Sequence, residues 1–283
     1  MASPKVVLIT GGNSGVGYEA VKIFLEADKP YHVLLAARSL EKATAAVESI
    51  KKECPGAKNT VEALALDVTS DESIKKAFEQ VKASPGHVDA LINNAGTQCA
   101  PLPLSYDIPL TSPGATFDLE FVAGNVSLRD CFNKAYDVNV TGAHVTSRTF
   151  MPLLLKSADP RLLFVAGLSH MTVANEGTYF PTPPQPAGWP KQIDFETIGY
   201  RCSKTALNML MLDWNHKLKA DGVKVWGVGP GFLATNLGNM KEKVKEMGGG
   251  HPSEGGVLYK KVVEGERDDQ VGKVIDKDGL VPL

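Results

Sequence analysis

The chain has 283 residues, of which 43% are hydrophobic, so it can bury the core of one large α/β domain or of two small ones. Its formal net charge is only −2, which excludes a strongly basic surface for nucleic acid or for an anionic membrane and leaves small molecules as the expected partners. Four cysteines without CxxC spacing predict free thiols in a reducing compartment, with no disulfide framework and no metal site.

The first apolar run begins at Lys5 or Val6, so we expect no signal peptide. No apolar run approaches the roughly 18 residues that a membrane span requires. The sequence therefore predicts a cytoplasmic protein without a membrane segment.

Six short apolar runs alternate with helical patterns along the chain. Most are apolar throughout, as strands of a parallel sheet must be when helices cover both faces. The runs are KVVLIT (5–10), HVLLAA (32–37), VEALALD (61–67), VDALIN (88–93), RLLFVA (161–166) and VKVWGV (223–228). They predict an α/β fold: a Rossmann-like, doubly wound parallel sheet with helices on both faces, forming a single domain over residues 1–283.

Apolar residues at helical spacing separate these runs. TSDE at 69–72 reads as a capping box that opens the third helix, which ends at Ala83. The alternation implies right-handed βαβ crossovers, and neither an internal repeat nor a linker divides the chain. The first two helices are indicated by Val16, Ala20, Val21 and Phe24, and by Ala43, Ala46, Val47 and Ile50.

The first strand is followed by TGGNSGVG, residues 10–17, at the junction with a helix. Gly11 allows a tight turn, Gly15 lets the backbone approach a pyrophosphate, and Gly17 permits close packing of helix on strand. The N–H groups at the start of the helix would bind the anion. A glycine loop alone is weak evidence, but this spacing between a strand and a helix favours a dinucleotide site over a plain turn.

The second strand ends in Ala36, Ala37, Arg38 and Ser39. A site that selects NAD needs a carboxylate here to accept hydrogen bonds from the ribose hydroxyls, and these residues carry none. Arg38 can instead clamp a 2′-phosphate through charge-assisted hydrogen bonds, although a surface arginine at a strand end is also common. We therefore expect NADP(H) as the cofactor.

Three segments interrupt the alternation of strands and helices. Residues 97–126 and 171–199 are long, rich in proline and aromatic residues, and follow strand ends where open α/β sheets bind ligands. We expect these two segments, together with residues 236–252, to be insertions that enclose an apolar substrate.

YRCSK, residues 200–204, places Tyr200 and Lys204 four residues apart and so on one face of a predicted helix. An ammonium beside a phenol favours the phenolate, which would bring the tyrosine pKa from about 10 towards working pH. Such a tyrosine can pass a proton to a carbonyl oxygen. Tyrosine and lysine also share exposed helix faces without any function, but the dinucleotide loop favours catalysis.

Taken together, these motifs resemble the short-chain dehydrogenase/reductase family. The matching pieces stand in the family's order: TGGNSGVG at 10–17, Asp67, NNAG at 93–96, Asn139 in DVNVTG, YRCSK at 200–204 and PGFLAT at 230–235. The start GGNSGVGYEAV and the AAR that ends the second strand are similar to the monomeric carbonyl reductase branch. The resemblance implies a nicotinamide-dependent oxidoreductase that is a monomer or a weak homodimer.

The resemblance also implies which residues bind the cofactor. Asp67 and Val68 would hold the adenine, and Leu233 and Thr235 would meet the nicotinamide end. The full expected set, with Asn94 and Gly96 along the nucleotide path, is Gly11, Asn13, Ser14, Gly15, Val16, Gly17, Arg38, Asp67, Val68, Asn94, Ala95, Gly96, Tyr200, Lys204, Pro230, Gly231, Leu233 and Thr235.

The same resemblance extends the catalytic set. Tyr200 would act as the acid, Lys204 would also hydrogen-bond the cofactor ribose, and Asn139 would lie at a kink in a long helix. There Asn139 would hold a water that relays protons to Lys204.

One catalytic position is changed in RLLFVAGLSHM, residues 161–171. In the family this strand ends in a Ser-Ser or Thr-Ser pair whose second serine steadies the substrate carbonyl, and here the pair falls on Ala166 and Gly167. Ser169 lies about 6.6 Å further along an extended chain, so it reaches the same place only if Gly167 turns the backbone. Ser169 is the candidate hydroxyl, with a cap of local backbone as its alternative role, and His170 is a further candidate donor.

Two function classes follow from this reading. The first is an NADPH-dependent reductase that converts a ketone or aldehyde of a small, largely apolar substrate to an alcohol. The second is a non-redox catalyst or nucleotide-binding protein that kept the nucleotide pocket and lost reductase chemistry with the serine. Loss of one oxyanion-type donor typically costs about 10² to 10³ in rate, so a slower reductase is favoured over none.

Overall fold

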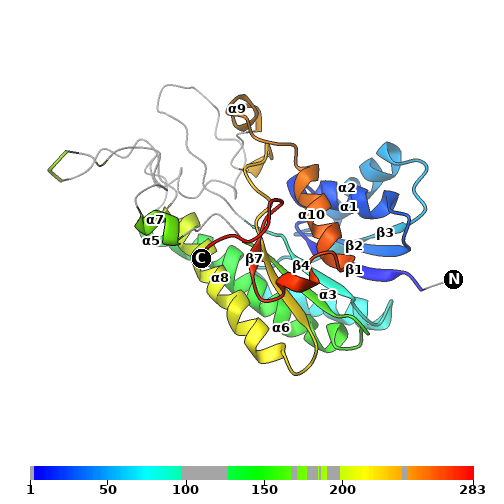
Figure 1. The fold of residues 1–283 in the computed structure, drawn as a ribbon. Coiled ribbons are helices and arrows are strands. Elements are labelled where there is room, and N and C mark those ends of the chain that lie inside the picture. The colour runs from blue at the N-terminus through cyan, green and yellow to red at the C-terminus, as the bar shows by residue number, and fades with distance from the viewer. Residues whose placement is uncertain are drawn as a thin grey trace.

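The computed structural model describes residues 3–96, 127–166, 171–176, 184, 186–189, 198–237 and 241–283. Seven strands of the described residues form one parallel sheet in the order β3-β2-β1-β4-β5-β6-β7 (Figure 1). The chain winds outward from β1 in both directions, which is the doubly wound arrangement that the apolar runs predict. The predicted Rossmann-like fold is confirmed.

All six predicted strands are present. They are β1 (Lys5–Thr10), β2 (Tyr31–Ala37), β3 (Thr60–Ala65), β4 (Ala90–Asn93), β5 (Arg161–Val165) and β6 (Lys224–Val228). The sheet has one further strand, β7 (Val274–Ile275), which pairs with Gly227 and Val228 of β6. A strand of two residues has no readable periodicity, so the apolar pattern does not reveal it.

Helices cover both faces of the sheet. They are α1 (Gly15–Glu26), α2 (Leu40–Glu53), α3 (Asp71–Ala83), α5 (Leu128–Tyr136), α6 (Ala143–Leu154), α7 (Met171–Asn175), α8 (Ile198–Leu218), α9 (Lys241–Glu246) and α10 (Ser253–Val263), with the π-helical turn η1 (Asp137–Gly142) and the 3₁₀ turn η3 (Asp268–Gln270). None of the described helices combines the length and the apolar character needed to cross a membrane.

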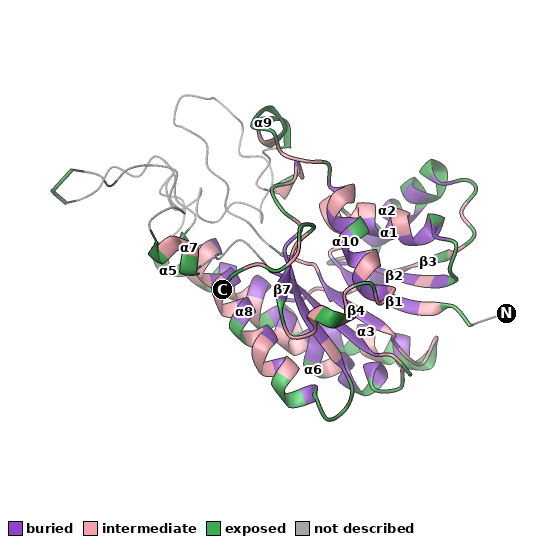
Figure 2. Cartoon of the chain, in the orientation of Figure 1, coloured by how far each residue is buried: buried purple, intermediate pink, exposed green. Residues whose placement is uncertain are grey.

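Two apolar cores lie on opposite faces of the sheet, and Figure 2 shows the buried strands between the helical layers. Val7 and Ile9 of β1 pack with α1, α2 and α10. Val6 and Leu8 pack with α3, α6 and α8. Successive strand side chains point to opposite faces, so a single run such as KVVLIT supplies both cores and must be apolar throughout.

Helix α3 ends at Ala83 as predicted, but its first cap differs from the capping-box interpretation. The cap residue is Ser70, whose Oγ accepts a hydrogen bond from the Ser73 N–H at 3.2 Å. Thr69 instead donates its hydroxyl to Asp67 Oδ1 at 2.8 Å. The prediction of a box at 69–72 is wrong in its capping residue, because the helix begins at Asp71 and Thr69, tied to Asp67 Oδ1 through its N–H and its hydroxyl, lies one residue before the cap.

The three expected insertions lie partly or wholly outside the described residues. Residues 97–126 are outside entirely. The segment 171–199 is described only at α7 and Glu176, at positions 184 and 186–189, and at the first turn of α8. Most of the segment 236–252 is described, and it contains α9.

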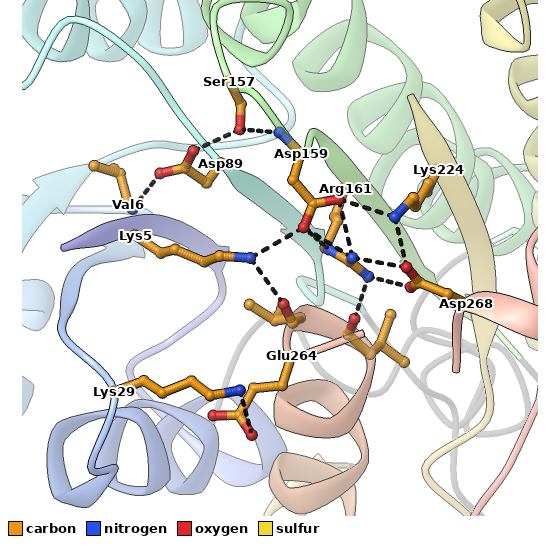
Figure 3. Close-up of polar contacts among 12 residues, drawn as sticks. Lys5, Val6, Lys29, Asp89, Ser157, Asp159, Arg161, Lys224, Glu264 and Asp268 are labelled. Atoms are coloured by element: carbon orange, nitrogen blue, oxygen red, sulfur yellow. Dashed lines mark hydrogen bonds and ion pairs between the residues drawn. The ribbon is translucent and has the colours of Figure 1, made fainter. Parts of the chain in front are cut away.

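An ion-pair network lies at the edge of the sheet where β1, β5 and β6 begin (Figure 3). Arg161 is 2% exposed and donates to Asp159 at 2.8 Å and to Asp268 at 2.6 Å. Lys224 donates to the same two carboxylates, at 3.0 and 2.5 Å, and Lys5 reaches Asp159 at 3.1 Å. Arg161 also donates to the backbone carbonyl of Val262 at 2.6 Å, so the network ties β1, β5 and β6 to the end of α10.

Replacing Asp268 with asparagine is expected to lower stability in a pH-dependent way. Burial alone would raise the pKa of Asp268, but hydrogen bonds from Arg161 and Lys224 outweigh it and hold the pKa below its ordinary value. A carboxylate with a lowered folded pKa stabilises the fold above its unfolded pKa, and this contribution is lost as the pH falls through the folded value.

Because the Asp268 side chain is 35% exposed, solvent screening limits the expected loss to about 1 kcal/mol at pH 7. Urea unfolding of wild type and Asp268→Asn between pH 7 and pH 3 checks this. The difference should shrink below about pH 4, the ordinary range of an unfolded aspartate. The control is Asp221→Asn, which changes an exposed aspartate in a turn. A pH-independent difference would contradict the assignment.

Candidate active site

A cavity of 510 Å³ lies at the carboxyl edge of the sheet. This edge is where loops that follow parallel strands can converge on one ligand. The loops after β1, β4, β5 and β6 all contribute, together with side chains of α2 and α8. From the expected cofactor set the lining contains Gly11, Asn13, Ser14, Gly15, Val16, Arg38, Asp67, Val68, Asn94, Ala95, Gly96, Tyr200, Lys204, Pro230, Gly231, Leu233 and Thr235.

The glycine loop connects β1 to α1 at the cavity. Gly11 has a φ of 64° and Gly15 a φ of 56°, a backbone region that favours glycine. A Cβ on Gly11 would lie 2.9 Å from the Ala95 Cα, so the loop approaches the end of β4 closely. Gly17 does not line the cavity: a Cβ there would lie 2.5 Å from Asn94 Nδ2 and 2.6 Å from the Gly11 carbonyl oxygen, so its role is helix packing.

Asn94 and Thr10 hold the ends of β4 and β1 together. The backbone N–H groups of Asn94 and Ala95 both donate to Thr10 Oγ1 at 3.0 Å. The Asn94 side-chain amide donates to the backbone carbonyls of Thr10 and Gly11, at 2.9 and 3.2 Å. The glycine loop is therefore fastened to NNAG through side chains that are 84 residues apart.

Two cations border the cavity beyond the end of β2. Arg38 and Lys42 are both exposed, and both line the cavity. Ser39 caps α2 by accepting a hydrogen bond from the Lys42 N–H at 3.3 Å. The motifs did not indicate Lys42, which lies in the first turn of α2, whereas Arg38 precedes the cap of that helix.

Asp67 and Val68 reach the cavity after β3. The Asp67 carboxylate accepts hydrogen bonds from the N–H and the hydroxyl of Thr69, at 3.0 and 2.8 Å. The backbone N–H of Asp67 donates to Ser73 Oγ at 2.9 Å. These bonds fix the loop at the start of α3, so both residues are held at the cavity wall.

Tyr200 and Lys204 lie one helical turn apart on α8 and both line the cavity. Only 9% of Tyr200 and 5% of Lys204 is exposed. The Lys204 ammonium lies 5.7 Å from the centre of the Tyr200 ring and donates to the Val165 carbonyl at 2.6 Å. Burial lowers the pKa of Lys204 to about 8. The arrangement brings a buried ammonium next to a tyrosine at the cavity, as the spacing in YRCSK suggests.

Asn139 lies behind this pair, in the π-helical turn η1 between α5 and α6. It is 1% exposed and donates to Ser203 Oγ at 2.9 Å, and Ser203 donates to the Tyr200 carbonyl at 2.7 Å. A Cβ on Gly96 would lie 3.3 Å from Asn139 Oδ1 and 3.5 Å from Lys204 Nζ, so both atoms approach the same point. The helix deviates from α geometry at the position where a kink is expected. Ser203 is a contact that the motif did not single out.

Gly167, Ser169 and His170 lie outside the described residues, so the changed serine position stays an open prediction. Their neighbour Ala166 follows β5 directly and lines the cavity. The described part of the chain contains no group of three or more His, Cys, Asp or Glu residues that could hold a metal ion.

The cavity lining also includes residues that no motif indicated. Asp276 and Val281, which follow β7, join the lining. Val281 donates its backbone N–H to the Val274 carbonyl at 2.9 Å, which holds the chain against the sheet edge. The loop after β6 is held by a bridge between Leu233 and Gly250. Nothing in the local sequence around Val281 signals a ligand, because its place depends on the pairing of β7.

The chain matches known proteins over nearly its whole length. The family model described as short chain dehydrogenase matches residues 5–180. The chain is 43% identical over 287 residues to the short-chain dehydrogenase/reductase tropE of Talaromyces stipitatus, covering 99% of this chain and 98% of that protein. It is 37% identical over 293 residues to the short-chain dehydrogenase/reductase eupG of a Phoma species, covering 99% of each.

Solved structures share the fold. A carbonyl reductase from chicken fatty liver with bound NADPH superposes with a TM-score of 0.72 at 21% identity, covering 99% of each chain. The L-sorbose reductase of Gluconobacter frateurii, in complex with NADPH and L-sorbose, gives a TM-score of 0.71 at 20% identity, covering 99% of this chain and 97% of that one. At these identities the likeness concerns the fold.

Proposed function

This chain belongs to the short-chain dehydrogenase/reductase family, and on that premise we propose that it uses NADPH to reduce a ketone or aldehyde of a small, largely apolar substrate to an alcohol. Family membership makes it an oxidoreductase with a nicotinamide cofactor. The choice of NADPH and the reduction of a carbonyl group are the proposal. The observation that carries the proposal is one cavity bordered by the glycine loop, by the Arg38–Lys42 cations and by the Tyr200–Lys204 pair.

The residues around the cavity fit a dinucleotide with a phosphorylated ribose. Gly15 and Val16, at the start of α1, line the cavity, where the first N–H groups of the helix would bind a pyrophosphate. Arg38 and Lys42 supply two positive charges where the adenosine ribose would lie, and the end of β2 carries no carboxylate to compete with a phosphate. Asp67 and Val68 would bound the adenine.

When bound, the cofactor supplies a hydride to the carbonyl carbon. Tyr200 would donate the phenolic proton to the carbonyl oxygen as negative charge develops there. Lys204, held by the Val165 carbonyl, would stabilise the phenolate left on Tyr200 and hydrogen-bond the ribose. Asn139 would connect Lys204 to a water, and its bond to Ser203 keeps the turn carrying it in register with α8.

Replacing Arg38 with alanine is expected to weaken NADPH binding and leave NADH binding unchanged, because only NADPH carries the 2′-phosphate. A hydrogen bond to a charged group contributes about 1.5 to 3 kcal/mol, which corresponds to about a 10- to 100-fold rise in the dissociation constant. Lys42→Ala should act in the same direction. Fluorescence titration of both cofactors measures the effect.

The control for both variants is Lys29→Ala, which removes an exposed lysine that does not line the cavity. Equal affinities of the wild type for NADPH and NADH would contradict the cofactor assignment. An unchanged NADPH affinity in Arg38→Ala would show that the phosphate is held elsewhere.

The proposed activity is tested by mixing purified protein and NADPH with a panel of ketones and aldehydes and following cofactor oxidation. Tight NADPH binding with silence across the panel would favour the alternative function, a non-redox catalyst or nucleotide-binding protein derived from this family. That alternative rests on one observation, the Ala166–Gly167 pair where the family has hydroxyl residues. Ser169→Ala and Gly167→Ser then separate a site rescued by Ser169 from one that works without the hydroxyl.

A further inference from the structure

Helix α10 lies near the C-terminal end of the chain, yet it packs beside the helix that follows the glycine loop. It packs against α1, and both of its glycines lie at close contacts. A Cβ on Gly256 would lie 2.9 Å from the Ala20 Cα, and a Cβ on Gly255 would lie 2.6 Å from Val16 Cγ1. The absence of side chains at these two positions lets α10 pack close to α1.

This close approach brings Tyr259 of α10 next to Asn94, the residue that holds the glycine loop. Its side chain is fully buried, and its hydroxyl lies 3.1 Å from Asn94 Oδ1. Asn94 itself lines the cavity, and its amide nitrogen donates to the carbonyls of Thr10 and Gly11. The two ends of the Asn94 amide therefore face opposite kinds of partner, a hydroxyl on one side and two backbone carbonyls on the other.

The orientation of that amide matters for the turn at Gly11. An amide rotated by 180° would point its oxygen at two carbonyl oxygens and its nitrogen at the Tyr259 hydroxyl. With the Tyr259 hydroxyl donating to Oδ1, all three hydrogen bonds are made at once. Burial, and next the nearby Tyr200, raises the pKa of Tyr259 well above its ordinary value, so the hydroxyl remains protonated and remains a donor.

We propose that Tyr259 is a positioning residue of the nucleotide site: its hydroxyl holds the Asn94 amide so that Asn94 keeps the Gly11 turn in the shape that binds the cofactor. This inference rests on the proposed function. Tyr259 does not line the cavity, so it acts through Asn94 and not by touching the ligand.

The test is Tyr259→Phe, with Tyr31→Phe as the matched control. Tyr31 is 1% exposed, donates its hydroxyl to Glu264 at 3.0 Å and does not line the cavity. Both variants remove one hydroxyl from a buried tyrosine, so both should lower the melting temperature. Tyr259→Phe alone should raise the NADPH dissociation constant and KM, by about three- to tenfold, the effect of one neutral hydrogen bond. Its kcat at saturating NADPH should fall by less than twofold.

A readout without ligand separates this inference from the proposed function. The Gly12 N–H donates to the Ala36 carbonyl at 2.9 Å, so hydrogen exchange of the peptide that contains Gly12 reports on the loop. Exchange should quicken in Tyr259→Phe and not in Tyr31→Phe. Unchanged exchange and affinity in Tyr259→Phe, or equal changes in both variants, would overturn the inference. A wild type that binds neither NADPH nor NADH would overturn the proposed function, and the exchange result would still decide the role of Tyr259.

Discussion

Replacing Tyr200 with phenylalanine is expected to lower kcat/KM for carbonyl reduction by about 10² to 10⁴, the usual contribution of a positioned general acid. The substitution removes the phenolic hydroxyl and retains the ring, so the packing of α8 should persist. NADPH affinity should change little, because the proton is needed only as the carbonyl oxygen gains charge. Steady-state kinetics on a responsive carbonyl compound, together with a cofactor titration, measure the two quantities separately.

The control for this substitution is Tyr18→Phe on α1. Tyr18 hydrogen-bonds Glu53 and does not line the cavity, so its loss should leave the rate unchanged. Full activity retained in Tyr200→Phe would overturn the reductase mechanism. A large rise in the NADPH dissociation constant would instead show that Tyr200 is needed mainly to bind the cofactor.

Replacing Lys204 with methionine is expected to lower the rate and stabilise the ligand-free protein. The rate should fall by about 10² to 10³, the cost of losing one preorganised electrostatic partner. The folded pKa of Lys204 is about 8, below the ordinary 10.5, because burial disfavours the ammonium. That cost to folding is fully present below pH 8 and disappears as the pH rises from 8 to above 10.5.

Methionine has a similar length and no charge, so Lys204→Met should be the more stable protein at pH 7. The gain has an upper limit on the order of 3 kcal/mol, the free energy of the pKa shift, and the lost bond to Val165 reduces it. Urea unfolding between pH 7 and pH 10 should show the difference shrinking as the pH rises. A variant less stable than wild type at pH 7 would contradict the cost assigned to the buried ammonium.

Lys217→Met provides the control on the same helix. Its ammonium is exposed and pairs with Asp213 four residues away. Lys217→Met should leave the rate unchanged, and it should not give the gain in stability at pH 7 that is expected for Lys204→Met. This pair of variants separates the loss of a buried charge from the loss of any lysine on α8.

The sheet could be predicted because each strand carries its own signal. KVVLIT and RLLFVA are apolar throughout since helices cover both faces, and the structure places them in β1 and β5. The same reasoning could not find β7, whose two residues form a strand only because Gly227 and Val228 offer an open edge. At the start of α3 both Thr69 and Ser70 could cap the helix by sequence, and Ser70 does so because the first helical residue is Asp71.

Local patterns in the chain reveal the glycine loop, its place between a strand and a helix, and the Tyr200–Lys204 spacing, because a single turn or helix forms each of them. The burial of Lys204 against the Val165 carbonyl, 39 residues away, depends instead on how α8 packs on the sheet. The contact between Tyr259 and Asn94, which are 165 residues apart, likewise depends on how α10 packs. Such contacts depend on how closely whole helices pack on the sheet and on one another. The sizes of side chains that are distant in sequence set these distances, as the two glycines of α10 do against α1. No local period in the chain encodes them.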